Sequence, residues 1–355
     1  MKTSPTNTSR RSALLLINLG TPDSPRPEDV RRYLRQFLLD PRVIDVAGWK
    51  RQLIVRLFIL PRRPRQAAKA YQKIWTEAGS PLLVESRALQ AKVQRRLGDQ
   101  TLVELAMRYG QPSIEAALGR LRDAGIDRIV ALPLYPQYAS STTGSSVEAL
   151  LSAIAPRINT PFVQVVPPFY DHPAYIDALA SVAGRAMARI DPDHVIFSYH
   201  GLPERHCIKS DDTGEHCLRR DDCCERIVAA NRNCYRAHCF ETTRLLTRRL
   251  EIADNRHTIC FQSRLGREPW LRPYTDEVLV ELAQQGVRRA AILSPAFVAD
   301  CLETLEELQI RGAELFREHG GETLTLIPAL NDDDAWADAV VRIARDTSAW
   351  LQPAV

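Results

Sequence analysis

A single histidine stands where a predicted buried strand ends. His200 follows an apolar run over residues 194–199, and the turn-forming residues Gly201 and Pro203 come directly after it. Ligands of open α/β sheets collect at the carboxyl ends of strands, and an imidazole there can accept a proton near neutral pH. The same position is also typical of a packed, hydrogen-bonded structural histidine. His200 is therefore a candidate catalytic base, with a structural role as the alternative.

Three carboxylates begin a predicted helix in the last third of the chain. The spacing of Asp300, Glu303 and Glu307 places them on one helical stripe, whereas Glu306 points away. Facing solvent, they would be an acidic helix start that complements the helix dipole. Facing a cleft, they would be a path for a loosely held divalent cation or an acid–base relay. Because this row and His200 both follow second-half strands, they can converge on a pocket where protons leave as a metal arrives.

Six of the eight cysteines fall in one window, residues 207–239. Disulfides are not expected if the protein is cytoplasmic. Soft thiolates at this density indicate an iron–sulfur cluster or zinc. Zinc is the weaker choice because the window contains no paired CxxC knuckles, and reduced thiols without a metal remain the third alternative.

Two further segments carry polar side chains in unusual numbers. The loop 136–146 is dense in hydroxyls ahead of a predicted helix, so it either caps that helix or holds an anion. Residues 43–71 mix bulky apolar side chains with many arginines. That segment is either an amphipathic helix and loop packed on the core, or an apolar lip around a pocket that also rests on a membrane surface.

Strand and helix patterns alternate along the whole chain. Apolar runs predict strands at 13–19, 102–109, 128–135, 162–166, 194–199, 258–262, 290–294 and 323–327, and helical periodicity fills the intervals between them. We expect two Rossmann-like domains with four-stranded parallel sheets flanked by helices and a cleft between them. Their expected bounds are 1–167, including the lip, and 168–355, including the cysteine window and a C-terminal helix.

Composition excludes several classes of protein. The 355 residues are 45% hydrophobic, and Lys+Arg exceeds Asp+Glu by only 47 to 43 without clustering, so no nucleic-acid partner is expected. No dinucleotide fingerprint or P-loop follows any strand. The first apolar run is too short to span a membrane, and the small-residue cleavage site that a signal peptide needs is absent. We expect a cytoplasmic protein with peripheral membrane contact through the lip as an option, as a monomer or homodimer.

Five ordered blocks resemble the ferrochelatase family, the terminal enzymes of haem synthesis. They are LINLGTP at 16–22, LYPQYASSTTGSS at 134–146, SYHGLPER at 198–205, QSRLGREPWLRPYTDE at 262–277 and SPAFVADCLETLEE at 294–307. The resemblance implies a lyase that binds a porphyrin in the cleft and inserts Fe²⁺, its metal substrate, into protoporphyrin IX to form haem.

The resemblance also assigns roles to individual residues. His200 matches the acceptor of pyrrole protons and Glu303 its acidic partner, while Glu307 and Asp300 match a row that guides the metal. The substrate iron would therefore meet His200 and these three carboxylates. The porphyrin-binding candidates come from two of the blocks and from the strand 102–109, and they are Arg108, Tyr109, Tyr138, Ser140, Thr142 and Trp270.

The cysteine window departs from the ordinary pattern of this family. Between Ser210 and Tyr235, where most members have a short turn, the chain carries an insertion. Some ferrochelatases carry a 2Fe–2S cluster, so the resemblance implies one here. Its expected ligands are the four insertion cysteines, with Cys207 as a further candidate and Cys239 less favoured: Cys217, Cys223, Cys224 and Cys234.

Two alternatives to this assignment remain open at the level of sequence. One is a chelatase that acts on coproporphyrin or sirohydrochlorin. The other is a non-catalytic iron–sulfur or haem-binding regulator with the same fold, which the joint presence of His200 and Glu303 disfavours.

Overall fold

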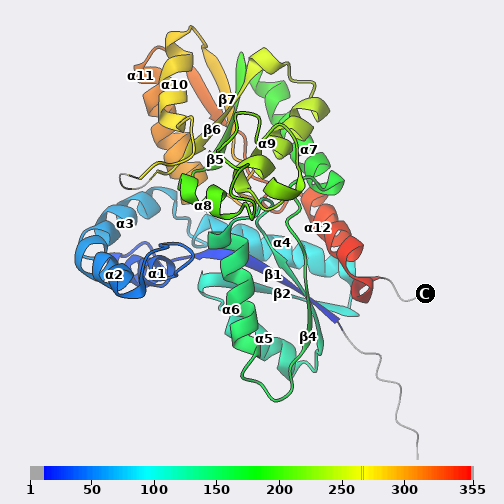
Figure 1. The fold of residues 1–355 in the computed structure, drawn as a ribbon. Helices are drawn as coiled ribbons and strands as arrows, with labels where there is room; N and C mark the ends of the chain where they lie inside the picture. Colours follow the sequence, from blue (N-terminus) through cyan, green and yellow to red (C-terminus); the bar gives the residue numbers. More distant parts are fainter. Residues whose placement is uncertain (1–11, 265, 267, 353–355) are drawn as a thin grey trace, which may run out of the picture.

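The computed structural model describes residues 12–352 except Leu265 and Arg267, which belong to the block at 262–277. Two α/β halves follow each other along the chain, each built on a four-stranded parallel sheet (Figure 1). The fold class expected from the alternation of strands and helices is confirmed.

The first sheet has the strand order β2-β1-β3-β4. The inner strand β1 (Ser12–Thr21) is buried along almost its whole length because helices cover both faces of the sheet. This burial explains its unbroken apolar run. The strands are β1 (Ser12–Thr21), β2 (Thr101–Gly110), β3 (Arg128–Pro133) and β4 (Phe162–Val165).

The second sheet repeats this topology with the order β6-β5-β7-β8. Its central strand β5 pairs in parallel with β6 and β7, so that the last residue, His200, lies opposite Gln262. The strands are β5 (His194–His200), β6 (His257–Gln262), β7 (Arg289–Leu293) and β8 (Thr323–Leu326).

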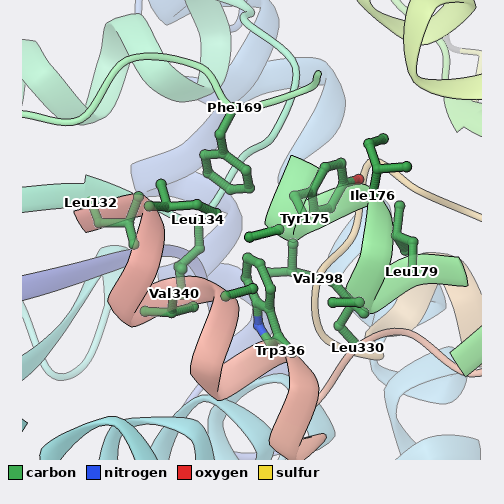
Figure 2. Packing of buried hydrophobic residues seen from close by; sticks show 14 of the residues in the cluster. Leu132, Leu134, Phe169, Tyr175, Ile176, Leu179, Val298, Leu330, Trp336 and Val340 are labelled. Carbon is green, nitrogen blue, oxygen red and sulfur yellow. The ribbon is translucent and has the colours of Figure 1, made fainter. Parts of the chain in front are cut away.

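Helices cover both sheets and join the two halves. They are α1 (Pro27–Leu38), α4 (Pro81–Leu97), α5 (Ile114–Asp123), α6 (Ser145–Ile154), α7 (Pro173–Ile190), α8 (Glu204–Lys209), α9 (Tyr235–Arg249), α10 (Thr275–Gln284), α11 (Ala313–Glu318) and α12 (Asp334–Thr347). The C-terminal helix α12 packs against both α7 and α4. Figure 2 shows its Trp336 beside Phe169 and Tyr175, with Leu134 of the first half nearby. One apolar cluster therefore extends across both halves, which fixes them around the space between the sheets.

The lip forms three short helical segments at one side of the first half (Figure 1): α2 (Gly48–Leu53), the π-helix η1 (Ile54–Ile59) and α3 (Arg63–Ile74). Several of its apolar side chains are exposed, namely Val46, Trp49, Leu53, Ile54, Leu57 and Phe58. In contrast, α3 packs its apolar face against α1 and the carboxylate-bearing helix of the second half. The lip thus has one packed side and one bare apolar side. None of the helices in the described part of the chain is long and apolar enough to cross a membrane.

The expected α-helix over residues 300–319 differs from the observed structure. Residues Glu303–Gly312 form a π-helix, η5, which continues into α11, and Asp300 lies in the loop before it. The prediction of a three-carboxylate stripe on one α-helix is therefore wrong for Asp300. A π-helix bonds residues five apart and so takes more than four residues per turn, which leaves Glu303 and Glu307 close to one face.

Candidate active site

His200 presents one ring nitrogen as a proton acceptor. Its Nδ1 lies 2.7 Å from the carbonyl oxygen of Gly201. A carbonyl oxygen can only accept, so Nδ1 must carry the hydrogen, and in the neutral ring Nε2 then holds a free lone pair. The edge of the half-buried ring faces Phe297, with ring centroids 6.2 Å apart. The backbone of the following residue therefore selects the tautomer in which His200 is a base at Nε2.

The turn after His200 brings two distant sequence blocks together. The amide of Gly201 donates to the carbonyl of Gln262 at 2.7 Å, and Pro203 pairs with Trp270 in a short antiparallel bridge. A Cβ at position 201 would lie 2.8 Å from that Gln262 oxygen and 3.3 Å from the Trp270 ring, so only glycine permits this approach. Within the described residues the buried Trp270 Nε1 has no hydrogen-bond partner. Trp270 thus lies against Gly201, the residue that follows His200.

Glu303, Glu307 and His200 lie within electrostatic reach of one another. Burial and the negative charge of Glu303 raise the pKa of Glu307, although a hydrogen bond from Ser263 and the positive charge of a protonated His200 act in the opposite direction. A carboxyl group with a raised pKa holds a proton closer to neutral pH than an ordinary glutamate does. The charge of Glu307 thus depends on the charges of both Glu303 and His200.

The carboxylate of Asp300 is hydrogen-bonded to other residues of the protein. Its buried carboxylate accepts hydrogen bonds from Asn331 Nδ2 at 2.7 Å and from Thr304 Oγ1 at 2.9 Å. Its own amide donates to Asn331 Oδ1 at 2.8 Å. These bonds fix the start of η5, so Asp300 holds the loop in place instead of extending the Glu303–Glu307 face.

Two tyrosines of the first half face Glu303 and were not identified from the sequence. Burial raises the pKa of the Tyr33 and Tyr71 hydroxyls well above the ordinary value, and the charge of Glu303 raises both further. Tyr71 also hydrogen-bonds with Tyr33 and with Thr21. In the sequence both tyrosines only continue the apolar faces of α1 and α3, so no local signal marks them.

The lip is joined to η5 directly. Lys73 Nζ lies 3.1 Å from Glu306 Oε1, and the Arg311 Nε lies 2.8 Å from the other oxygen of the same buried carboxylate. Tyr71 packs in the same apolar cluster as Leu302. The lip therefore packs directly against the helix that carries Glu303 and Glu307.

Arg108 and Tyr109 are bound to a buried carboxylate at the base of the lip. Arg108 Nη2 lies 2.7 Å and Tyr109 Oη 2.8 Å from Asp40 Oδ2, which also accepts from Ser145. Burial acts to raise the pKa of Asp40, but these hydrogen bonds, the amide of Arg42 and the charge of Arg108 lower it below its usual value. The Arg108 guanidinium and the Tyr109 hydroxyl are thus both bound to Asp40. Fixed side chains of this kind suit the wall of a site.

The hydroxyls of the loop 136–146 are largely used within the protein. Ser140 Oγ accepts from Arg42 Nη1 at 2.9 Å, and Thr142 Oγ1 lies 3.4 Å from the carbonyl of Ala139. The segment Ser140–Gly144 is a π-helix that leads into α6. Tyr138 and Ser140, but not Thr142, line a cavity of about 460 Å³ between the two halves, which Leu202 also borders. These contacts do not favour an anion site formed by the whole loop.

Four buried cysteines are joined by hydrogen bonds between their thiols, with Cys234 as the shared partner. We call them the four-cysteine group: Cys207, Cys217, Cys224 and Cys234. The thiols of the other three donate to Cys234, which lowers its pKa, while these hydrogen bonds, burial and the negative charge of Cys234 raise the pKa values of the three donors. Cys223 lies beside the group, with its sulfur 3.7 Å from that of Cys224. Cys207, and not Cys223, is thus the third thiol that donates to Cys234.

The sulfurs of Cys207, Cys217 and Cys224 each lie within hydrogen-bonding reach of the Cys234 sulfur. All eight cysteines are free and buried. Among the residues that the structure describes, no three His, Cys, Asp or Glu side chains are placed so that they could hold a metal ion as they stand. The group is thus identified by its donor atoms and their mutual contacts.

Comparison with known proteins identifies close relatives over nearly the whole chain. The family model described as Ferrochelatase matches residues 11–348. A protein named Ferrochelatase from Pseudomonas fluorescens (strain Pf0-1) is 50% identical over 332 residues, covering 93% of this chain and 96% of the relative. Proteins of the same name from Azotobacter vinelandii and Coxiella burnetii (strain Dugway 5J108-111) are 49% and 46% identical, covering 94% and 95% of this chain and 98% and 94% of their own.

Solved structures share the fold at low sequence identity. SirB from Bacillus subtilis with Fe³⁺ aligns with a TM-score of 0.53 at 14% identity, covering 96% of each chain. The sirohydrochlorin chelatase SirB from Bacillus subtilis subspecies spizizenii, in complex with cobalt, gives 0.51 at 13% identity, covering 95% of each chain. These similarities establish the two-sheet fold of this chain.

Proposed function

The chain belongs to the ferrochelatase family, and from that membership we propose how its own residues insert Fe²⁺ into protoporphyrin IX to form haem. As a member of this family it is an enzyme of haem biosynthesis that inserts a metal into a porphyrin. The observation that carries the proposed mechanism is the free Nε2 of His200 beside the Glu303–Glu307 pair.

Metal insertion exchanges two protons for one divalent ion. Two pyrrole N–H bonds break, the nitrogens bind Fe²⁺, and both protons must leave the ring. We assign the acceptance of a pyrrole proton to His200 Nε2, since its Nδ1–H is held by the Gly201 carbonyl. Glu307, with its raised pKa, receives protons from His200, and Glu303 lies between these groups and the lip. The carboxylates also attract the incoming cation.

Aromatic side chains from both halves favour a flat, apolar substrate. Trp270 and Phe297 lie beside His200, and Tyr33 and Tyr71 lie on the lip side near Glu303. A preformed apolar pocket binds a macrocycle and can hold it in the bent form that exposes its nitrogens. This set supports a porphyrin with few carboxylates over a highly charged tetrapyrrole.

The choice of porphyrin is tested by comparing two substrates. With Fe²⁺ under anaerobic conditions, we expect kcat/KM for protoporphyrin IX to exceed that for coproporphyrin III by at least about tenfold. The two extra carboxylates of coproporphyrin would have to be buried against an apolar wall, which costs more than about 1.4 kcal/mol. A higher kcat/KM for coproporphyrin would assign the enzyme to that substrate instead.

We further propose that the four-cysteine group holds a 2Fe–2S cluster. The residues fit such a cluster in type, number and burial, because all four are buried thiols that contact one another. Backbone amides at the start of α9 donate to two of the sulfurs, Arg236 N–H to Cys207 and Ala237 N–H to Cys234, and such bonds stabilise thiolates. When bound, the cluster would supply one-electron redox chemistry, and no step of metal insertion depends on it here.

We also propose that the bare side of the lip rests on a membrane surface. Trp49 and Phe58 are 69% and 62% exposed, and Lys50, Arg51 and Arg56 lie between them in the sequence. Apolar side chains flanked by cations suit an anionic lipid interface.

Charged substitutions on the lip should weaken vesicle binding. The double substitution Trp49→Glu and Phe58→Glu is expected to lower binding to phosphatidylglycerol-containing vesicles at least about tenfold, because each buried aromatic contributes more than about 1.5 kcal/mol. Co-sedimentation measures the effect. Ile158→Glu is the matched control, since Ile158 is a fully exposed apolar residue outside the lip. Equal binding of the lip variant and the control would contradict the proposal.

A further inference from the structure

Arg236 reaches the cysteines with both its backbone and its side chain. It is the second residue of α9, two positions after Cys234. Its Nη1 lies 3.0 Å from the Cys224 sulfur and 3.7 Å from the Cys223 sulfur, and its amide donates to Cys207. A single residue therefore contacts three sulfurs.

The guanidinium of Arg236 donates its side-chain hydrogen bonds to cysteine sulfurs. In the described part of the chain no carboxylate forms an ion pair with it, although arginines elsewhere on the surface pair repeatedly with Asp and Glu. Its Cζ lies 4.4 Å from the centroid of the Phe240 ring, which holds the opposite face of the group. A half-buried cation without an anionic partner is costly, so thiolates or a negatively charged cluster at these cysteines would compensate its charge.

We propose that Arg236 sets the reduction potential of the iron–sulfur cluster, an inference that rests on the cluster proposed above. Reduction adds one electron to the cluster from a one-electron donor, and no bond to the protein forms or breaks. The added negative charge strengthens the attraction to the guanidinium, so Arg236 stabilises the reduced state more than the oxidised state. Removal of this charge should make the potential more negative.

The test is a redox titration of the purified, cluster-loaded protein. Dithionite is the electron donor, and visible absorbance and the electron paramagnetic resonance of the reduced cluster are the readouts. We expect Arg236→Gln to lower the midpoint potential by at least about 59 mV, a tenfold loss in electron affinity. Arg232→Gln is the matched control because it removes one exposed positive charge, paired with Asp212 at 3.4 Å, four residues before Arg236. Its potential should equal that of the unmodified protein.

Arg236→Lys separates charge from loss of structure. It should keep the potential closer to that of the unmodified protein than Arg236→Gln does, and iron and sulfide contents verify the loading of each variant. If Arg236→Gln matches Arg232→Gln, or if Arg236→Lys falls as far as Arg236→Gln, the inference is overturned while the cluster stands. Unmodified protein that contains no iron and sulfide overturns the proposed cluster and this inference together, leaving metal insertion into porphyrin unaffected.

Discussion

His200→Ala is expected to lower kcat for Fe²⁺ insertion by about 10²- to 10⁴-fold, the usual contribution of a positioned general base. The ring accepts the pyrrole proton at Nε2, and alanine offers no acceptor there, so water would have to take over. The KM for porphyrin should change little, because Trp270, Tyr33 and Tyr71 remain in place. Anaerobic assays of haem formation measure both constants.

The matched control for this variant is His319→Ala, which removes an exposed histidine after α11. Both variants should keep the thermal unfolding midpoint within a few degrees, so a difference in kcat cannot arise from unfolding. Unchanged metal insertion by His200→Ala would remove His200 from the mechanism.

Cys224→Ser is expected to abolish the visible absorbance of a protein that is brown when purified anaerobically. Cys224 donates to Cys234 within the four-cysteine group, so its loss leaves the cluster with three of its four thiolates. Iron and acid-labile sulfide contents should fall with the colour. Absorbance spectroscopy with metal analysis of the same sample measures the effect.

Two cysteine variants make this prediction specific to the group. Cys260→Ser changes a buried cysteine of β6 outside the group and should leave the colour intact. Cys207→Ser should bleach the protein, whereas Cys223→Ser should not, since the thiol of Cys207 and not that of Cys223 donates to Cys234. A colourless unmodified protein containing one zinc would refute the cluster, and bleaching by Cys223→Ser but not Cys207→Ser would restore the ligand set expected from the sequence.

The prediction of His200 as a candidate base at a strand end followed from local pattern. An apolar run of six residues before His200 predicts a buried strand, and Gly201 and Pro203 predict its end. In parallel sheets such ends lie at one edge, so the sequence also predicted that His200 and the second-half carboxylates approach each other. The strand end is predicted from neighbouring residues, and the approach of the carboxylates from the general geometry of parallel sheets. Neither prediction needs the tertiary structure.

The partners of these side chains were decided by long-range packing. Tyr33 and Tyr71 face Glu303 only because α3 packs on η5, residues more than 200 positions apart. Asp300 does not share a helical face with Glu303 and Glu307, because Asn331 from the loop after β8 binds its carboxylate. No periodicity in either segment encodes such a contact.

The cysteines show the same division between sequence and tertiary structure. Their number and spacing in the window 207–239 indicated a metal group, because soft thiolates at that density have few other roles. The paths of α8, the insertion and α9 decide which thiols bond to each other. They bring Cys207 to Cys234 and leave Cys223 beside Cys224. The sequence by itself thus determined the fold class and the presence of a cysteine-rich window, and it marked His200 as a candidate base. The choice of neighbours for each side chain was left to the tertiary structure, since it depends on how distant segments pack.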